Sequence, residues 1–469
     1  YVYQYLNCTQ PCFRLWISSL TDESVRQGME NLKPDSCYDS LFLSADSRNK
    51  ADWILGINAS YAMCKATGFG NNSLGRVQTP VLAAISRRYR ERENHISSDS
   101  WPIYISLKKD GILFKMRRTQ DLPDKESATM FFQDCKLAHQ AQITGICHSV
   151  KEILPPELLN LTQLQKEANI RYGFTASEVY DIAQSLYEKK LISYPRTSSR
   201  CLTEDVFDSL PPIMVRLLSW ELFPAAKGTG GIDISNLSRH VISAEKANVH
   251  HAIIITAIRP GNLSEKEMQV YRLVAGRMLE TFMAPCHIET TGIEAVCAAQ
   301  HFKAEQTRII EAGWHDVFMR SDMVPTSGYS VNELPEVEKG DTLNVFGCNM
   351  VHKKQLPVDP FTDAELVEYM ELNGLGTVSS RTNIIRTLVN RKYIRYSGKY
   401  IVPTPKGMFT YETIRGKKIA DTSLTADWEK QLAGLESGMI TGQDFLNKIR
   451  TLAKEMTDDI FNTYSTKEE

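Results

Sequence analysis

The short motifs that assign chemistry at a glance are missing from this sequence. It has no Walker A motif, no GxGxxG loop and no HExxH motif, so ATP-driven, dinucleotide-dependent and HExxH-type zinc chemistry find no support in it. Its ten cysteines include no CxxC pair. A zinc ribbon is therefore unsupported, no metal-ligating residues are predicted, and reduced thiols in a cytoplasm are the expected state.

A charge excess and long apolar runs are also lacking. Lys and Arg number 54 against 56 Asp and Glu, a net charge of -2, so any nucleic-acid binding must depend on local patches. No stretch is long and apolar enough to span a membrane, and the first residues do not resemble a signal peptide. Because the chain does not begin with Met, we expect its true start to lie upstream.

What is present is a chain of 469 residues with helical and strand patterns in alternation. The pattern is helical in residues 1–95, strand-like in 100–150, helical in 157–275, strand-like in 287–346 and helical in 361–463. This order predicts a β domain interrupted by a helical domain, with the outer helical regions joined in one further domain. Such nesting favours an open, arched or ring-like body.

Residues 191–197, LISYPRT, carry the strongest chemical hint. Tyr194 is a candidate covalent nucleophile for a phosphodiester, and Arg196 can hold the phosphoryl oxygens. A free phenol has a pKa of about 10, so a nearby cation would help it to react. The competing interpretation, which is commoner for a tyrosine at such a position, is a buried structural ring in a wing-like hairpin.

The same pattern occurs a second time in the chain. At a constant offset, residues 177–194 match residues 379–396, and Tyr194 falls on Tyr396. Thr175 and Glu178 form a candidate capping box in the first copy, and Ser397-Gly398 predicts a hairpin in the second. Helix plus hairpin is the outline of a winged helix, although two unrelated helix–strand joins would give the same pattern. Tyr396 lacks the adjacent Pro-Arg.

Other residues suit phosphate or nucleic-acid contact. His250 can donate to a phosphate or relay a proton, with a surface His250-His251 pair as the alternative. Arg76 and Gln78 lie near a helix start and suit a phosphate contact, whereas the arginines of residues 87–92 are interpreted as a solvated helix face.

A basic segment over residues 381–399 contains no acid and interleaves cations with tyrosines, which suits single-stranded nucleic acid. Its candidate DNA-binding residues are Arg381, Arg386, Arg391 and Lys392. The interleaved rings are those of Tyr393, Tyr396 and Tyr400.

Seven motifs, taken together and in this order, resemble the type IA DNA topoisomerases, nearest the topoisomerase III branch. They are residues 14–21 (RLWISSLT), 51–58 (ADWILGIN), 75–80 (GRVQTP), 192–197 (ISYPRT), 250–254 (HHAII), 374–377 (GLGT) and 424–429 (LTADWE). Each motif alone is of modest specificity, but their common order is highly specific.

The resemblance implies a mechanism. Tyr194 would attack one strand of single-stranded DNA and form a 5′-phosphotyrosine, another strand or duplex would pass, and the freed 3′-OH would reseal the break without ATP. Arg196 looks like the residue that orients the tyrosine and phosphate, and His250 matches a histidine that contacts that phosphate. Arg76 and Gln78 are similar to residues lining the DNA path.

The fold class implied is a multidomain α+β toroid fragment with winged-helix-like helical domains and a β gate domain. The expected domains are a helical DNA-binding domain (1–95 with 355–469), a β-rich gate domain (96–153 with 276–354) and a helical domain carrying the tyrosine (154–275). The family's Toprim domain, with a catalytic Glu and the acidic Mg²⁺ ligands, is expected to lie before residue 1. A chain without it is expected to bind DNA but to be inactive.

The partner expected is single-stranded DNA, with a helicase as an open question, no membrane, a monomeric state and a cytoplasmic location. The alternative function is a non-catalytic single-stranded nucleic-acid-binding protein, for which residues 381–399 matter and Tyr194 does not. A tyrosine recombinase or relaxase would need an Arg-His-Arg set or a metal-binding His cluster, and neither is seen.

Overall fold

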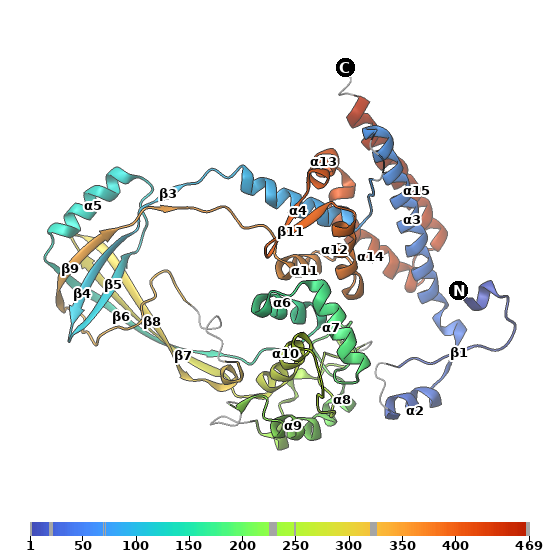
Figure 1. Cartoon of the computed structure of the whole chain (residues 1–469), viewed down its shortest axis with the longest axis horizontal. Helices are drawn as coiled ribbons and strands as arrows, with labels where there is room; N and C mark the ends of the chain where they lie inside the picture. The colour runs from blue at the N-terminus through green and yellow to red at the C-terminus, as the bar shows by residue number, and fades with distance from the viewer. Residues whose placement is uncertain are drawn as a thin grey trace.

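A closed barrel of antiparallel strands forms one side of a ring-shaped molecule, and helices form the other side (Figure 1). This computed structural model describes residues 2–17, 22–68, 70, 72–224, 232–247, 250–318 and 326–465. The motif over residues 14–21 is therefore described only as far as Ile17, because Ser18 to Thr21 lie outside these ranges.

The barrel has the strand order β4-β5-β8-β7-β6-β9. Its strands are β4 (Ile103–Lys109), β5 (Ile112–Arg118), β6 (Gln140–Ile153), β7 (Cys286–Cys297), β8 (Gln300–Glu311) and β9 (Thr342–Met350). Alternate side chains of β4 are buried, so Ile103, Ile105 and Leu107 fill the interior as the period of two requires. Helix α5 (Lys125–Leu137) packs against β9 and β4 on the outside.

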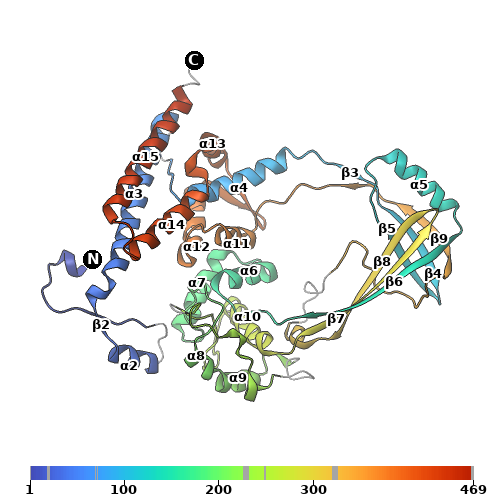
Figure 2. The ribbon, with the colours of Figure 1, turned by 180° about the vertical axis from the view of Figure 1, so that it is seen from behind.

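Two connections carry the chain between the barrel and the helices. Strands β6 and β7 stay paired from Gln142–Val296 to Ile153–Cys286, and this long ribbon leads to the green and yellow helices in Figure 1. The other connection contains the short pair β3 (Asp99–Ser100) and β10 (Lys353–Lys354). Figure 2 shows from behind that these two connections form opposite sides of the ring.

The helices reached through the β6–β7 ribbon share one core. They are α6 (Leu161–Tyr172), α7 (Ala176–Glu188), α8 (Glu204–Asp208), α9 (Leu210–Ser219) and α10 (Glu265–Phe282). The predicted capping box of Thr175 and Glu178 is present at the start of α7. Helix α10 runs across the expected boundary between residues 275 and 276, and Val270 and Met278 lie in the same core. This helical unit therefore continues to Phe282.

The outer helical regions pack together around two cores. One core joins α3 (Asp39–Thr67), α14 (Ser423–Glu436) and α15 (Gly442–Ser465), and α3 and α15 lie side by side in both views (Figures 1 and 2). The other core joins α4 (Gln78–Glu93), α11 (Asp363–Leu372), α12 (Val378–Asn390) and the hairpin β11 (Ile394–Ser397)–β12 (Tyr400–Pro403), with α13 (Pro405–Ile414) beside α4.

The N-terminal segment lies beside α3. It contains α1 (Val2–Tyr5), α2 (Asp22–Glu30) and the paired strands β1 (Phe13–Arg14) and β2 (Lys33–Pro34). Short 3-10 turns complete the chain at η1 (Asp35–Tyr38), η3 (Ile234–Asn236), η4 (Arg239–Val241), η5 (Gly313–Val317) and η7 (Lys418–Ala420).

The ring is closed where α6 and α7 pack against α11 and α12. The Gln165 amide donates to Thr382 Oγ1 at 2.9 Å, and Lys166 pairs with Glu368 at 2.6 Å. The multidomain α+β toroid predicted from the motifs is thus confirmed in outline. No helix of the described segments has the length and apolar character needed to cross a lipid bilayer.

Candidate active site and nucleic-acid interface

The turn after α7 places Tyr194. Lys190 adopts a left-handed φ of 59°, and the amide of Leu191 donates to Leu186 O at 2.9 Å, which ends the helix in a Schellman turn. Ile192 then forms a bridge with Ile255, and the amide of Ser193 donates to Ile254 O at 2.8 Å. Tyr194 leaves this short pairing directly over the segment that carries the two histidines.

Tyr194 is half-buried between two other rings. Its ring centroid lies 5.3 Å from Tyr187, edge to face, and 4.6 Å from His250. These rings line a largely apolar cavity of about 730 Å³, together with Ile254. Burial and the neighbouring Tyr194 raise the pKa of Tyr187. Within the described segments the Tyr194 hydroxyl has no hydrogen-bond partner, so it is free to meet a ligand.

Arg196 lies two residues further on, in a second cavity. Its guanidinium carbon lies 5.0 Å from the centre of the Tyr180 ring, and its Nη2 donates to Gln184 Oε1 at 3.3 Å. Its Nε is buried and has no hydrogen-bond partner. Because a buried N–H without a partner is costly, this atom suits an incoming acceptor such as a phosphoryl oxygen.

The two histidines have different surroundings. His251 is only 8% exposed, and its Nδ1 donates to Ala252 O at 2.7 Å. Burial lowers the pKa of His251, which favours the neutral ring. His250 lines both cavities, and its buried Nδ1 has no partner. The structure therefore brings Tyr194, Arg196 and His250 together, whereas His251 is buried and lines only the first cavity.

The second cavity, of about 280 Å³, extends the site across the ring closure. Arg196 and His250 line one side of it, and Thr377 and Ser379 at the start of α12 line the other. Lys246 also lines it and is exposed. Sequence reasoning did not select Lys246, since no motif marks it and only the folded chain brings it beside Arg196.

Arg76 joins three of the sequence motifs. Its side chain, 5% exposed, pairs with Asp52 at 2.9 Å and with Glu429 at 3.0 Å. Its guanidinium carbon also lies 4.8 Å from the centre of the Trp428 ring. Burial alone would lower the pKa of Arg76, but the hydrogen bonds and charges of the two carboxylates outweigh this and raise it. In this state Arg76 links α3 to α14 and is not open to solvent.

Gln78 belongs to a more accessible cluster. Its Nε2 donates to Ser73 Oγ at 2.8 Å, and its Oε1 accepts from Arg391 Nη1 at 3.0 Å. Arg391 also donates to Ser73 Oγ and is exposed. A cation held only by neutral groups keeps its charge available for a phosphate. The exposed Lys392 lies next in the chain.

The remaining candidates in residues 381–399 lie in the ring closure. Arg381 is 8% exposed, pairs with Glu371 at 3.3 Å and donates to Thr162, and burial lowers its pKa. Arg386 pairs with Asp181 of α7 at 2.8 Å. Tyr393 is fully buried, so the expected stacking on its ring is not available in this state. The segment thus divides into interface residues and exposed cations, which include Arg391, Lys392, Arg395 and Lys399.

The Mg²⁺ implied by the motifs does not fit the residues around Tyr194. Mg²⁺ is usually held by more than one carboxylate or by a carboxylate and phosphates, whereas the two cavities at Tyr194 contain a single carboxylate, Glu188, among rings, cations, hydroxyls and apolar side chains. In the described ranges no three His, Cys, Asp or Glu side chains are grouped as metal ligands. We therefore derive no step through a metal.

Similarity to solved structures defines the class of fold. The chain superimposes on the full-length topoisomerase I from Thermotoga maritima with a TM-score of 0.73 and 23% sequence identity. The match covers 96% of this chain and 73% of that one. The ring of barrel and helices is thus a topoisomerase fold.

The sequence comparisons then give the family. The family model described as DNA topoisomerase matches residues 36–447, and the chain belongs to this family. It is 32% identical to DNA topoisomerase 3 of Bacillus licheniformis, over 96% of this chain and 65% of that protein. It is 31% identical to DNA topoisomerase 3 of Bacillus subtilis, over 98% and 66%. The chain thus spans just under two thirds of the length of these relatives. The predicted resemblance to the topoisomerase III branch of the type IA enzymes is confirmed.

Proposed function

We propose that this chain carries the tyrosine half of an ATP-independent topoisomerase that cleaves one DNA strand and reseals it. The observation that carries the proposal is the meeting of Tyr194, Arg196 and His250 around two adjoining cavities. Each of these side chains keeps a polar atom without a partner among the described residues. That arrangement suits a phosphodiester, whose oxygens would accept from the arginine and the histidine.

The chemistry proposed is a reversible transesterification. Tyr194 Oη attacks the phosphorus, the bond from phosphorus to the 3′-oxygen breaks, and the phenolic proton ends on the departing 3′-hydroxyl. The product is a 5′-phosphotyrosine, and the reverse attack by the 3′-hydroxyl restores both the strand and the free phenol. One phosphoester bond replaces another, so no ATP is consumed. Arg196 and His250 would neutralise the phosphoryl oxygens during both steps.

The proposal includes Mg²⁺ as the metal of the intact enzyme, held by acidic residues of the family's Toprim domain. That metal would supply charge to the reacting phosphate when bound. Relaxation or decatenation of DNA is the resulting activity that we propose for the whole protein.

The test uses the protein expressed from its complete coding sequence. We expect it to relax negatively supercoiled plasmid with Mg²⁺ and without ATP, and to remain covalently attached to the 5′ end of the downstream oligonucleotide fragment when quenched with detergent. Tyr194→Phe should abolish both signals, whereas Tyr396→Phe should retain them. Relaxation by a Tyr194→Phe protein would show that another group is the nucleophile.

The second candidate, a non-catalytic single-strand binder, is favoured by the exposed Arg391 and its neutral partners, the half-buried Ser73 and Gln78. If the protein is such a binder, neither the parent nor the Tyr194→Phe variant would form an adduct, and Arg391→Ala would still weaken oligonucleotide binding. The adduct assay therefore separates the two functions.

A further inference from the structure

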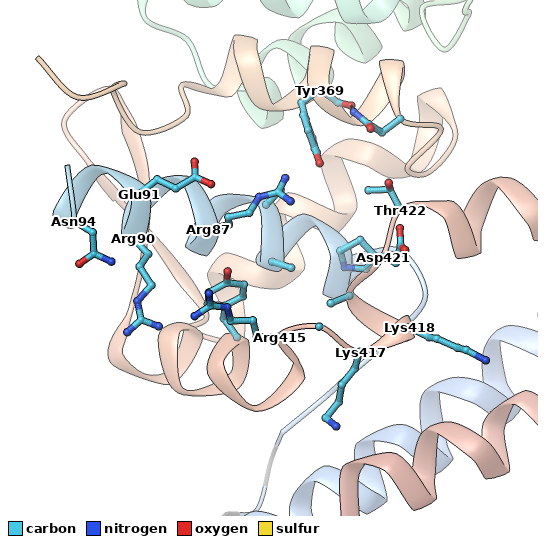
Figure 3. A pocket seen from close by; sticks show the side chains of 17 residues that line it. Arg87, Arg90, Glu91, Asn94, Tyr369, Arg415, Lys417, Lys418, Asp421 and Thr422 are labelled. Atoms are coloured by element: carbon cyan, nitrogen blue, oxygen red, sulfur yellow. Dashed lines mark hydrogen bonds between the residues drawn. The ribbon is translucent and has the colours of Figure 1, made fainter. Parts of the chain in front are cut away.

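A cavity larger than either of the two at Tyr194 lies away from the tyrosine. We call it the α4 cavity; its volume is about 1050 Å³, and its walls are α4, α11, the end of α13 and the loop over residues 416–422 (Figure 3). None of its lining residues lines either of the two cavities at Tyr194.

The α4 cavity lies on the face of α4 opposite the Gln78 cluster. Arg87 follows Gln78 by nine residues, which at about 100° per residue is half a turn round the helix. The other α4 side chains in the cavity, among them Ala84, Glu91 and Asn94, are spaced with Arg87 along one stripe. A strand bound at Gln78 and Arg391 would therefore not occupy the α4 cavity.

Five cations line this cavity, and they differ in how they are held. Arg90 pairs with Glu412, Lys417 with Asp459 at 2.9 Å and Lys418 with Glu455 at 3.2 Å. These three cations hold α4 and the α13–α14 loop to neighbouring helices, and a carboxylate already neutralises each of them.

Arg87 and Arg415 are different. Both are exposed, and neither side chain has an ion pair or hydrogen bond within the segments that the structure describes. Figure 3 shows Arg87 extending from α4 toward Tyr369 on α11, with Arg415 on the α13 wall. Arg88, the next residue to Arg87, has acceptors in Glu365 and Asp359. Arg88, Arg90 and Arg92 of this arginine run thus make ion pairs, whereas Arg87 keeps a free charge.

Two free guanidiniums at the mouth of a polar cavity, with the half-buried ring of Tyr369 between the walls, match the needs of a nucleic-acid strand. Guanidiniums bind phosphates through paired N–H groups, and a phenol ring offers a face to a base. We propose that the α4 cavity binds a second segment of single-stranded DNA through its backbone phosphates, with Arg87 and Arg415 as the contacts. This deepens the proposed function and rests on it, since the first segment is the one held near Tyr194.

The test compares binding of labelled oligothymidylates of two lengths by fluorescence anisotropy. A strand of about 10 nucleotides fills one groove, whereas one of about 40 can also reach a second. We expect the double variant Arg87→Ala/Arg415→Ala to weaken binding of the long strand at least about tenfold and the short strand little. The slope of log K against log salt for the long strand should fall by about 1.4, which corresponds to two lost phosphate contacts.

Matched variants make the result specific. Arg450→Ala removes an exposed arginine from α15, outside the cavity, and should change neither strand. Arg87→Lys/Arg415→Lys should keep most of the salt slope, and Glu91→Gln, which removes an acid from the same wall, should strengthen binding of the long strand. Thermal unfolding checks that each variant is folded.

Unchanged binding of the long strand by the folded double variant would overturn the proposal, and so would an effect confined to duplex DNA. The covalent adduct at Tyr194 separates this failure from that of the proposed function, and Arg391→Ala shows whether a strand binds elsewhere on the chain. If Arg391→Ala weakens the short strand while the double variant does nothing, the α4 cavity is refuted and DNA binding stands. If the double variant leaves binding unchanged and the parent forms the adduct, the α4 cavity is refuted and the proposed function stands; if the folded parent forms no adduct, the proposed function fails.

Discussion

The same helix end occurs twice in this molecule, once with Tyr194 and once with Tyr396. After α7 and after α12 the chain turns through a lysine with left-handed backbone, Lys190 with φ of 59° and Lys392 with φ of 60°. The following amides, of Leu191 and Tyr393, each donate five residues back at 2.9 Å. Two helices of equal length thus end in the same Schellman turn, and a tyrosine follows each at the same distance.

The two tyrosines then meet opposite surroundings. Tyr396 lies in the β11–β12 hairpin and donates to the buried Asp363 at 3.1 Å, and burial together with that carboxylate raises the pKa of Tyr396. Tyr194 is followed by Pro195 and Arg196 in place of a hairpin, and its hydroxyl has no partner in the described segments. The comparison teaches that the helix end positions a phenol, while the residues after it decide whether the phenol is occupied or free.

The largest effect expected on this comparison is that of removing each hydroxyl in turn. Tyr194→Phe should abolish the covalent DNA adduct of the intact protein, because no other group replaces a lost nucleophile. Tyr396→Phe removes one hydrogen bond and should cost about 1 kcal/mol of stability with the adduct retained. Adduct yield on a denaturing gel measures the first effect and thermal unfolding the second. Equal loss of adduct in both variants would show that the different surroundings of Tyr194 and Tyr396 do not decide which tyrosine reacts.

The leucines that accept the turn hydrogen bonds offer a structural counterpart. Leu186 and Leu388 are 0% and 1% exposed and lie in different cores. Truncating either to Ala should destabilise the fold by about 2–5 kcal/mol, since both leave a cavity in a packed core. Urea unfolding of the two variants would measure this. A cost under about 1 kcal/mol for one of them would mean that its helix end is not packed as the repeat implies.

Much of this repeat could be predicted from the sequence. The pairing of Tyr194 with Tyr396, the Thr175–Glu178 capping box and the ring-like order of helices and strands depend on local spacing, which a sequence displays. The ion pair of Arg386 with Asp181 could not be predicted, because it joins residues 205 positions apart. The DNA-binding roles of Arg76, Gln78, Arg391 and Lys392 stay predictions.

The Asp363 carboxyl, which accepts a hydrogen bond from Tyr396, gives the fold a pH dependence. Burial raises the pKa of Asp363 to about 6, with the Ala176 amide and Tyr396 opposing the shift. The folded state therefore favours the protonated acid, and this stabilisation is fully present below pH about 4 and is lost as the pH rises through 6. A shift of about two units corresponds to at most about 3 kcal/mol.

Asp363→Asn keeps an acceptor for both donors and cannot ionise. We expect the difference in unfolding free energy between this variant and the parent to grow in the variant's favour from pH 4 to pH 7. Urea unfolding at several pH values would measure it. Because the other carboxylates titrate alike in both proteins, their contribution cancels when the two unfolding free energies are subtracted. A difference that stays constant over this range would place the Asp363 carboxyl in water rather than in the interface.

The smallest effect expected concerns the contact between the two repeats themselves. Arg386 of α12 reaches Ser177 and Asp181 of α7, and the Arg386 and Asp181 side chains are 40% and 61% exposed. An ion pair so exposed contributes about 1 kcal/mol or less, so a double-mutant cycle of Arg386→Ala and Asp181→Ala should return a coupling no larger than this.

Arg391, five residues on, has only neutral partners and should matter more for DNA. Arg391→Ala should therefore weaken binding of a short oligothymidylate more than Arg386→Ala does, and the reverse order would mean that the α7–α12 contact opens to give Arg386 to the DNA.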